Sequence, residues 1–235
     1  MVVIMPSGLL LKLSLLAAML AAGGCAVPLF IGGALQNEEY QKLLDTPPKY
    51  AGLEDQTVAV IVNADMATLY EHPGLTADIA GGISQRIGHF APGAKVLNPQ
   101  HVINWQYRTP QWSALPYGDM AEQLNVERVV YIELLEYRLN PPGNRWLWEG
   151  VATGRIGVIE RHSLDPDSFI ETFDVAAKYP SISGVGREST DQAHIEFGLK
   201  YNFIEKASWL FYQHLEPKYP DKYRPELETP KKKTS

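Results

Sequence analysis

Hydrophobic positions along the chain alternate between runs typical of buried strands and stripes typical of helices. Residues 57–62 form a continuous β-prone apolar run, which predicts a strand covered on both faces. An apolar residue then recurs at every fourth position from 75 to 87, which predicts an amphipathic helix. Gly81 and Gly82 lie inside this helix and should weaken it by about 1 kcal/mol each. Residues 94–99 indicate a short second strand.

The middle of the chain predicts a short helix and a long strand. Residues 101–112 are ambiguous, and a short helix broken before the proline at position 110 is one interpretation. The apolar positions of 119–124 indicate another short helix, after which Asn125 can take the left-handed conformation. Residues 128–139 predict a long strand that is buried on both faces over its first half.

Two further strands and a helix complete the pattern. The strands are predicted over 145–160 and 168–178, and an Asp-Pro turn between them favours an antiparallel hairpin. Trp146 and Trp148 share one face of the first strand, where we expect them to pack under a helix. A final helix is expected to open at Ser189, where "STDQ" resembles a capping box. Its wide apolar face is predicted to contain Phe197, Leu199, Tyr201, Phe203, Ile204, Ala207, Leu210 and Phe211.

This order of elements predicts one α/β domain. The order β-α-β-α-β-β-β-α corresponds to an α+β sandwich with a mixed sheet of about five strands and the long C-terminal helix packed on it. We place this domain at 55–216, after a tether at 25–54 and before a mobile, Pro-rich, charged tail at 217–235.

The first residues have the pattern of an export signal. Lys12 is the only charged residue in 1–37, and an apolar stretch follows it. Small residues at 22–24 then precede Cys25, the only cysteine among the 235 residues. This arrangement resembles a bacterial lipobox, in which the peptidase cuts before a cysteine that carries the lipid. We therefore expect residues 1–24 to be a lipoprotein signal peptide and Cys25 to be acylated, so that its acyl chains bind the membrane.

Two alternatives concern the membrane. The apolar run is about long enough to span a bilayer, which leaves an uncleaved inner-membrane anchor as an alternative to lipidation. Gly23, Gly24 and Pro28 argue against a spanning helix, because they interrupt the second half of that run. Ala26 follows the cysteine where inner-membrane lipoproteins usually carry Asp, so by analogy with lipoprotein sorting we expect the outer membrane.

Composition and charge exclude several classes of protein. A formal net charge of -6 gives no basic face for nucleic acid, and the one short lysine run lies at 231–233. A single cysteine excludes an internal disulfide and a multi-cysteine metal site. The six histidines are scattered, with no pair at metal-ligand spacing. We therefore expect no metal and no cofactor.

The search for catalytic groups finds only weak patterns. Ser84 follows Gly82 as in a nucleophile elbow, but Arg86 stands where the second glycine belongs. Glu133 and Glu136 could form a carboxylate pair, but on a regular strand a spacing of three places them on opposite faces. The sequence therefore predicts a protein that is not an enzyme.

The aromatic segment at 105–117 is the best candidate for binding a protein partner. Aromatic and arginine side chains are enriched where protein interfaces have their strongest contacts. The candidate residues are Trp105, Tyr107, Arg108, Trp112 and Tyr117. The alternative interpretation is that these aromatics cover the core as a lid.

Two stretches of the chain carry a family resemblance. "VAVIVNAD" opens the domain, and "MAEQLNVERVVYIELLEY" lies in its middle. Together with the order of elements they resemble a group of envelope proteins that includes the amino-terminal domain of TolB, the curli-secretion lipoprotein CsgG and the penicillin-binding-protein activator LpoB. The likeness covers roughly 56–215, and it implies a compact α/β sandwich on a lipid tether that docks onto envelope machinery.

These observations lead to one hypothesis and its alternatives. We expect a non-enzymatic outer-membrane lipoprotein that faces the periplasm and serves as an accessory or assembly factor of an envelope complex through protein contacts. The alternatives are an envelope enzyme or small-ligand binder whose site is built from distant residues, and an inner-membrane protein with an uncleaved anchor.

Overall fold

The computed structural model describes residues 39–220 and 222–223. Cys25, the predicted signal peptide and most of the predicted tail lie outside the described residues. The chain divides into two compact units, Pro47–His214 and a smaller unit made from both ends of the chain. No helix within the described part is long and apolar enough to cross a bilayer.

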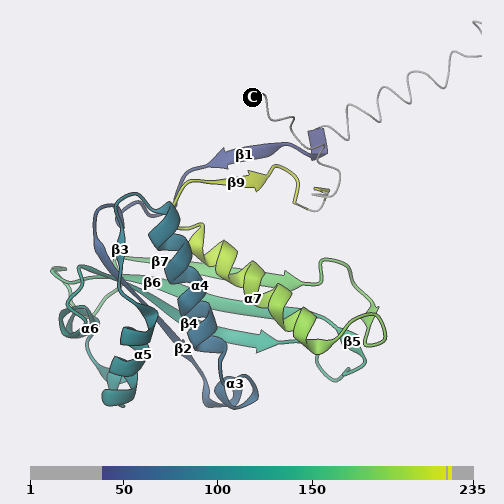
Figure 1. Cartoon of the computed structure of the whole chain (residues 1–235), viewed down its shortest axis with the longest axis horizontal. Helices are drawn as coiled ribbons and strands as arrows, with labels where there is room; N and C mark the ends of the chain where they lie inside the picture. Colours follow the sequence, from purple (N-terminus) through teal and green to yellow (C-terminus); the bar gives the residue numbers. More distant parts are fainter. Residues whose placement is uncertain (1–38, 221, 224–235) are drawn as a thin grey trace, which may run out of the picture. The chain divides into compact units, whose positions relative to one another are not determined.

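A mixed five-stranded sheet forms the centre of the larger unit (Figure 1). Its strand order is β3-β2-β4-β6-β7, with β2 parallel to both β3 and β4, and with β6 antiparallel to β4 and β7. The strands are β2 (Thr57–Ala64), β3 (Lys95–Val96), β4 (Arg128–Arg138), β6 (Gly150–Glu160) and β7 (Glu171–Tyr179). This sheet confirms the predicted fold class.

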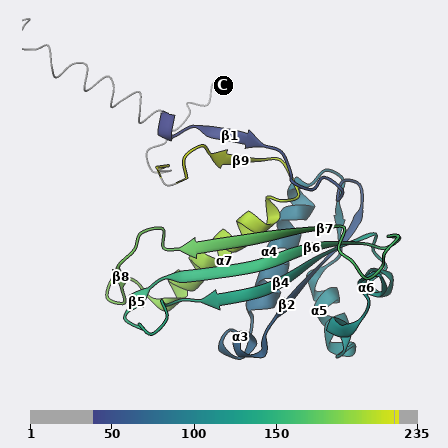
Figure 2. The same cartoon turned by 180° about the vertical axis from the view of Figure 1, so that it is seen from behind.

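Helices cover both faces of the sheet (Figures 1 and 2). The helices α4 and α7 lie side by side on one face, and α5 and α6 lie on the other. The bounds are α3 (Met66–Glu71), α4 (Leu75–Phe90), α5 (Pro99–Arg108), the 3-10 helix η1 (Trp112–Ala114), α6 (Tyr117–Gln123) and α7 (Gln192–Ser208). Side chains at the N-cap fix where two of these helices begin. The Asn98 side chain accepts a hydrogen bond from the Gln100 amide at the start of α5, and the Asp191 side chain accepts one from the His194 amide at the start of α7.

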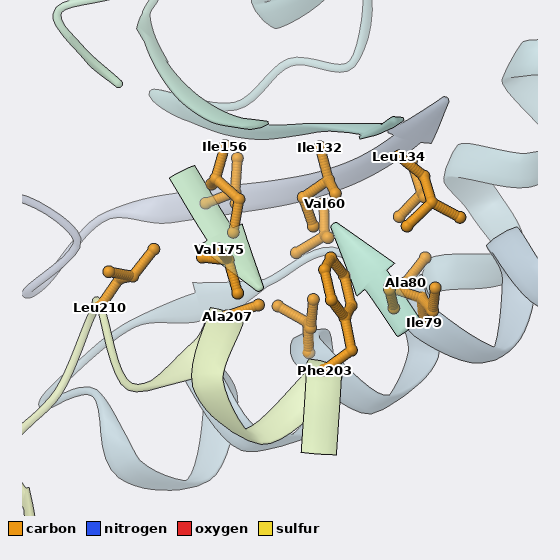
Figure 3. Close-up of a cluster of buried hydrophobic side chains, with 14 of the residues drawn as sticks. Val60, Ile79, Ala80, Ile132, Leu134, Ile156, Val175, Phe203, Ala207 and Leu210 are labelled. Carbon is orange, nitrogen blue, oxygen red and sulfur yellow. The ribbon is translucent and has the colours of Figure 1, made fainter. Parts of the chain in front are cut away.

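The first core lies between the sheet and the helices α4 and α7. Figure 3 shows Phe203 pointing from α7 toward Val60 and Ile132 of the sheet. The two helices approach closely at Gly82, where a Cβ atom would lie 2.7 Å from Ile204 Cδ1. The glycine that should weaken α4 therefore makes room for α7.

The second core is smaller, because α5 and α6 cover only part of the other face. Figure 2 shows β4, β6 and β7 in front, with no helix over the half of these strands that lies away from α6. Charged side chains pair across these strands: Glu133, Arg155 and Asp174 stand opposite one another, and Arg155 Nε donates to Asp174 Oδ1 at 3.3 Å.

A β-bulge in β4 corrects the prediction for the two glutamates. The register shifts between Leu134 and Glu136, so that Glu133 pairs with Arg155 and Glu136 pairs with Thr153. Because these partners are two residues apart on β6, the two glutamates share one face of the sheet rather than opposite faces. The extra residue of a bulge has no signal in a sequence that alternates normally on both sides of it.

The predicted strand at 145–160 is divided into two. Its first part is β5 (Leu147–Trp148), which pairs with β8 (Val185–Gly186) in a separate two-stranded sheet. Trp148 is buried as predicted, and its Nε1 donates to the Thr190 carbonyl at 3.0 Å. Trp146 is 79% exposed, so the expectation that both tryptophans pack under a helix is wrong for Trp146.

The final helix begins later and buries a narrower face than predicted. Its N-cap is Asp191 rather than Ser189. A line at spacing four, which includes Leu199 and Phe203, faces the core, whereas Phe197 and Tyr201 are exposed. Residues two positions apart on a helix differ by about 200°, so both aromatic side chains point away from that line.

The compact unit begins at Pro47, earlier than the predicted position 55. Tyr50 and Leu53 are buried in the first core, and the Tyr50 amide donates to the Leu210 carbonyl at 2.9 Å. The Pro-rich stretch predicted as tether therefore continues the domain, because its two large side chains fill the end of the core.

The smaller unit joins segments from both ends of the chain. Strand β1 (Leu43–Thr46) pairs with β9 (His214–Pro217), and the Lys218 amide donates to the Lys42 carbonyl at 2.9 Å. Glu39 forms ion pairs with both Lys42 and Lys218. Hydrogen bonds from these two ammonium groups lower the pKa of Glu39 to about 2.

Candidate interaction site

The topology of the sheet opens a crevice at the carboxyl end of β2. The chain leaves β2 for α4 on one face of the sheet, returns to β3, and then leaves β3 for α5 on the other face. When neighbouring parallel strands send their connections to opposite faces, a crevice is left outside their carboxyl ends. Here the crevice has a volume of about 330 Å³.

Apolar side chains form most of the crevice, with a few polar groups between them. The carboxyl end of β2 contributes Val62, Asn63 and Ala64, and the first turn of α4 contributes Thr76. Asn63 Nδ2 donates to the Tyr131 hydroxyl at 3.3 Å, which orients the amide. Burial raises the pKa of Tyr131, so its hydroxyl stays neutral at neutral pH. An apolar crevice with few polar groups is the usual form of a binding site.

Helix α5 supplies the wall that carries Tyr107. Ile103, Gln106 and Tyr107 are three and four residues apart, so they lie on the same side of the helix and line the crevice. Tyr107 is 81% exposed, and Trp112 of η1 completes this wall.

The five predicted partner-binding residues have different positions in the structure. Trp105 and Tyr117 are half-buried over the second core, where Trp105 Nε1 donates to Gln123 Oε1 at 3.1 Å. Tyr117 stacks on Phe169 with ring centroids 4.2 Å apart. Trp112 covers the core and also lines the crevice. Trp105 and Tyr117 therefore match the lid that was the alternative interpretation.

Tyr107 and Arg108 are the exposed members of the predicted set. Arg108 has no ion pair within the described residues. The structure thus brings Tyr107 and Trp112 together at the crevice, with the free charge of Arg108 next to Tyr107 in the chain. Their role in binding a partner stays a prediction.

Sequence reasoning missed the crevice residues that come from other elements. Asn63 lies in β2, Thr76 in α4 and Tyr107 in α5, and only the strand order brings the three together. The signal that could have found Asn63 is its position just after a buried strand, at the edge where parallel strands end.

A second exposed aromatic surface lies on α4 and α7. Phe197 and Tyr201 stack with centroids 6.5 Å apart, and Arg86 lies 5.9 Å from the rings of both Tyr201 and Phe90. Arg86 Nε donates to Ser208 Oγ at 3.0 Å, and this contact helps to hold α4 against the end of α7. The sequence signal for this surface was the offset of two residues between Phe197 and Leu199.

The described residues include no cluster suited to a metal ion and no nucleophile elbow. Within 39–220 and 222–223 no group of three or more His, Cys, Asp or Glu side chains is arranged to hold a metal ion. Ser84 is buried within α4. A nucleophile elbow needs a sharp turn between a strand and a helix, so Ser84 does not form one.

Comparisons with known proteins find solved structures that align with this chain at low sequence identity. No protein-family model matches the chain, and no curated protein matches it. The PelC dodecamer from Paraburkholderia phytofirmans aligns at 13% identity over 73% of this chain and 98% of that chain, with a TM-score of 0.42. The lipoprotein GNA1162 from Neisseria meningitidis aligns at 11% identity over 60% and 90%, with a TM-score of 0.39.

A third structure, the protein CT253 from Chlamydia trachomatis, aligns at 18% identity over 65% of this chain and 95% of that chain, with a TM-score of 0.38. The similar structures thus include a bacterial lipoprotein. At these TM-scores the likenesses carry no argument about the family or function of this chain, and the resemblance to TolB, CsgG and LpoB stays a prediction.

Proposed function

We propose that the chain is an outer-membrane lipoprotein that faces the periplasm and binds a protein partner at the crevice beside Tyr107. It acts without catalysis, as an accessory or assembly factor of an envelope complex. The observation that carries this proposal is the crevice itself, where an exposed tyrosine and a half-buried tryptophan border an apolar floor.

The membrane part of the proposal rests on Cys25. Its position after three small residues and an apolar stretch supports cleavage before the cysteine and acylation of the new N-terminus. Two or more acyl chains give stable anchoring, because each buried methylene contributes about 0.8 kcal/mol. Ala26 supports the outer membrane as the destination.

The contact part of the proposal rests on the chemistry of the crevice wall. Binding energy in protein interfaces concentrates in aromatic and arginine residues that border a pocket. Tyr107 offers a large exposed ring, Trp112 offers a half-buried ring, and Arg108 offers a charge that forms no ion pair among the described residues. An apolar side chain of the partner would fill the crevice while a carboxylate of the partner meets Arg108.

Site-specific photocrosslinking in the intact lipoprotein tests this contact. A photoreactive phenylalanine analogue replaces Tyr107 in one strain and Leu164 in a control strain, because both residues are strongly exposed, at 81% and 107%. Leu164 follows β6 at the end of the sheet opposite to the crevice. We expect a discrete crosslinked protein from position 107 and none from position 164. Equal crosslinking from both positions, or none from 107, contradicts the proposal.

Affinity for the captured partner gives the second measurement. Because Tyr107 is exposed, Tyr107→Ala should leave folding intact while weakening binding about tenfold or more, as hot-spot aromatic residues do. If the crevice instead binds a small apolar ligand, position 107 yields no protein crosslink, and the proposed protein contact is wrong.

A further inference from the structure

We propose that a second cleft, at the carboxyl end of β4, binds an acidic saccharide through Trp146 and Arg145. The cleft has a volume of about 780 Å³ and shares no lining residue with the crevice beside Tyr107. Its wall comes from the end of α3, the loop between β4 and β5, and the first residue of α7.

The loop that carries Trp146 is held in one conformation by its own polar groups. Asn140 Nδ2 donates to the Leu147 carbonyl at 2.6 Å, and the Trp146 amide donates to Asn144 Oδ1 at 2.9 Å. The Arg187 amide donates to the Trp146 carbonyl at 3.2 Å, so hydrogen bonds hold Trp146 on both sides. Gly143 takes a φ of 75°, which closes the turn after two prolines. A ligand that binds here loses little affinity to ordering of the loop.

Arg138 fixes the base of this loop and is fully engaged in doing so. Its Nε donates to Glu136 at 2.7 Å, its Nη1 donates to the carbonyls of Asn140 and Glu149, and its Nη2 donates to the Glu149 carboxylate at 3.0 Å. Two carboxylates therefore more than offset the charge of this guanidinium, and it is not the group that attracts a ligand.

Arg145 is the arginine of the cleft that remains free to bind. It is exposed and has no ion pair within the described part of the chain. A guanidinium forms paired, parallel hydrogen bonds with a carboxylate, which gives affinity and a fixed orientation. The cleft thus offers one site for a single carboxylate.

Trp146 gives the cleft one exposed aromatic face. An indole exposes a broad apolar ring face, and 79% of Trp146 is accessible. The ring lies in a cleft that polar side chains such as Asn140, Arg145 and Gln192 also line, so the surface fits a ligand with one apolar face and a polar rim. A pyranose ring has this form, because its axial C–H groups make a flat apolar face and its hydroxyl groups surround it.

The remaining polar groups can serve such a rim. Asn140 Oδ1 and the Gln192 side chain have no hydrogen-bond partner within the described residues, and both line the cleft. Amide groups donate and accept, which matches hydroxyl groups that do both. Glu71 adds an acceptor for hydroxyl protons at the edge of the cleft. Indole, amides and one arginine together specify a sugar that carries a carboxylate.

Binding of defined oligosaccharides to the chain without its first 25 residues tests the proposal. The probes are a tetrasaccharide of alternating glucuronic acid and N-acetylglucosamine, the neutral N-acetylglucosamine tetramer, and a tetraglutamate peptide. We expect the acidic tetrasaccharide to bind at least tenfold more tightly than the other two and to shift the tryptophan emission to shorter wavelength, because binding covers an exposed indole.

Three variants separate the roles of the residues. Trp146→Ala should lower affinity for the acidic tetrasaccharide at least tenfold and abolish the emission shift. Arg145→Gln should remove the preference for the acidic over the neutral tetramer, and Tyr107→Ala should change neither result. The proposal is overturned if tetraglutamate binds as tightly as the saccharide, if no saccharide binds, or if Trp146→Ala leaves affinity unchanged. Circular dichroism spectra of the variants confirm that each is folded.

Discussion

Two neighbouring glycines of α4 should respond oppositely to the same substitution. A Cβ atom at Gly81 would meet no atom within 4 Å, whereas one at Gly82 would lie 2.7 Å from Ile204 Cδ1 and 3.0 Å from its Cγ2. Gly81→Ala should therefore stabilise the protein by about 1 kcal/mol, the difference in helix propensity. Gly82→Ala gains the same propensity but overpacks the contact with α7, which costs roughly 1–3 kcal/mol.

The contact at Gly82 is hard to relieve because Ile204 is β-branched and stiff at χ1 within a helix. Rotation of its outer bond can move Cδ1, but Cγ2 stays near the new methyl group. We therefore expect Gly82→Ala to be destabilised by about 1 kcal/mol net. The two variants should differ by about 2 kcal/mol in their free energies of unfolding.

Urea unfolding of the soluble chain measures this difference. With a slope of about 2 kcal/mol per molar urea, the midpoint should rise by about 0.5 M for Gly81→Ala and fall by about 0.5 M for Gly82→Ala. Ile204→Val removes Cδ1, so combining it with Gly82→Ala should restore part of the loss in a non-additive way. Equal stabilisation by both glycine substitutions would refute the close approach of α4 and α7.

Three further predictions concern single positions. Asn125 has a φ of 53°, and its side chain accepts a hydrogen bond from Arg161. Asn125→Gly and Asn125→Ala both lose that bond, but only alanine brings a Cβ atom into the left-handed conformation. The alanine variant should therefore be less stable than the glycine variant by about 1 kcal/mol in urea unfolding. Phe203→Ala should lower the free energy of unfolding by about 3–5 kcal/mol in the same assay, because Phe203 is fully buried between α7 and the sheet. A loss below about 1 kcal/mol would contradict that placement. The pKa of Glu39 in the folded chain is about 2, below its ordinary value of 4.5. Its ion pairs therefore stabilise the β1–β9 pairing above pH 4.5, and this stabilisation is lost as the pH falls toward 2. An NMR titration of Glu39 with a midpoint near pH 4.5 would contradict this.

The elements that could be predicted from sequence are those with a long local period. The stripe along α4 and the apolar run of β4 repeat often enough to determine both type and length, and the structure confirms them. Asn125 also has the predicted left-handed conformation, since few other residues tolerate it.

Orientation within an element was harder to predict than its type. Phe197 and Tyr201 add to the apolar content of α7. Because they are offset by two residues from Leu199, however, their side chains face the solvent. The same problem arises in β4, where a bulge reverses the faces of the residues after Leu134. In both cases a displacement of one or two residues decides which side chains are buried.

The candidate sites depend on contacts that are distant in sequence. The segment at 105–117 was found because it is rich in aromatic residues, but which of its members are exposed depends on Tyr131 and Phe169 beneath them. The crevice beside Tyr107 follows from the strand order, and the cleft at Trp146 follows from a loop whose hydrogen bonds replace the predicted strand. Neither strand order nor these hydrogen bonds leave a periodic signal.

The mass of the protein purified from bacterial membranes tests the central claim most directly. The account predicts a chain that begins at Cys25 and carries the added mass of a diacylglyceryl group and an N-linked acyl chain, and it predicts that Cys25→Ala abolishes both the acyl mass and retention in the outer membrane. A membrane-bound protein that still contains residues 1–24 without lipid would contradict it and would favour an uncleaved anchor.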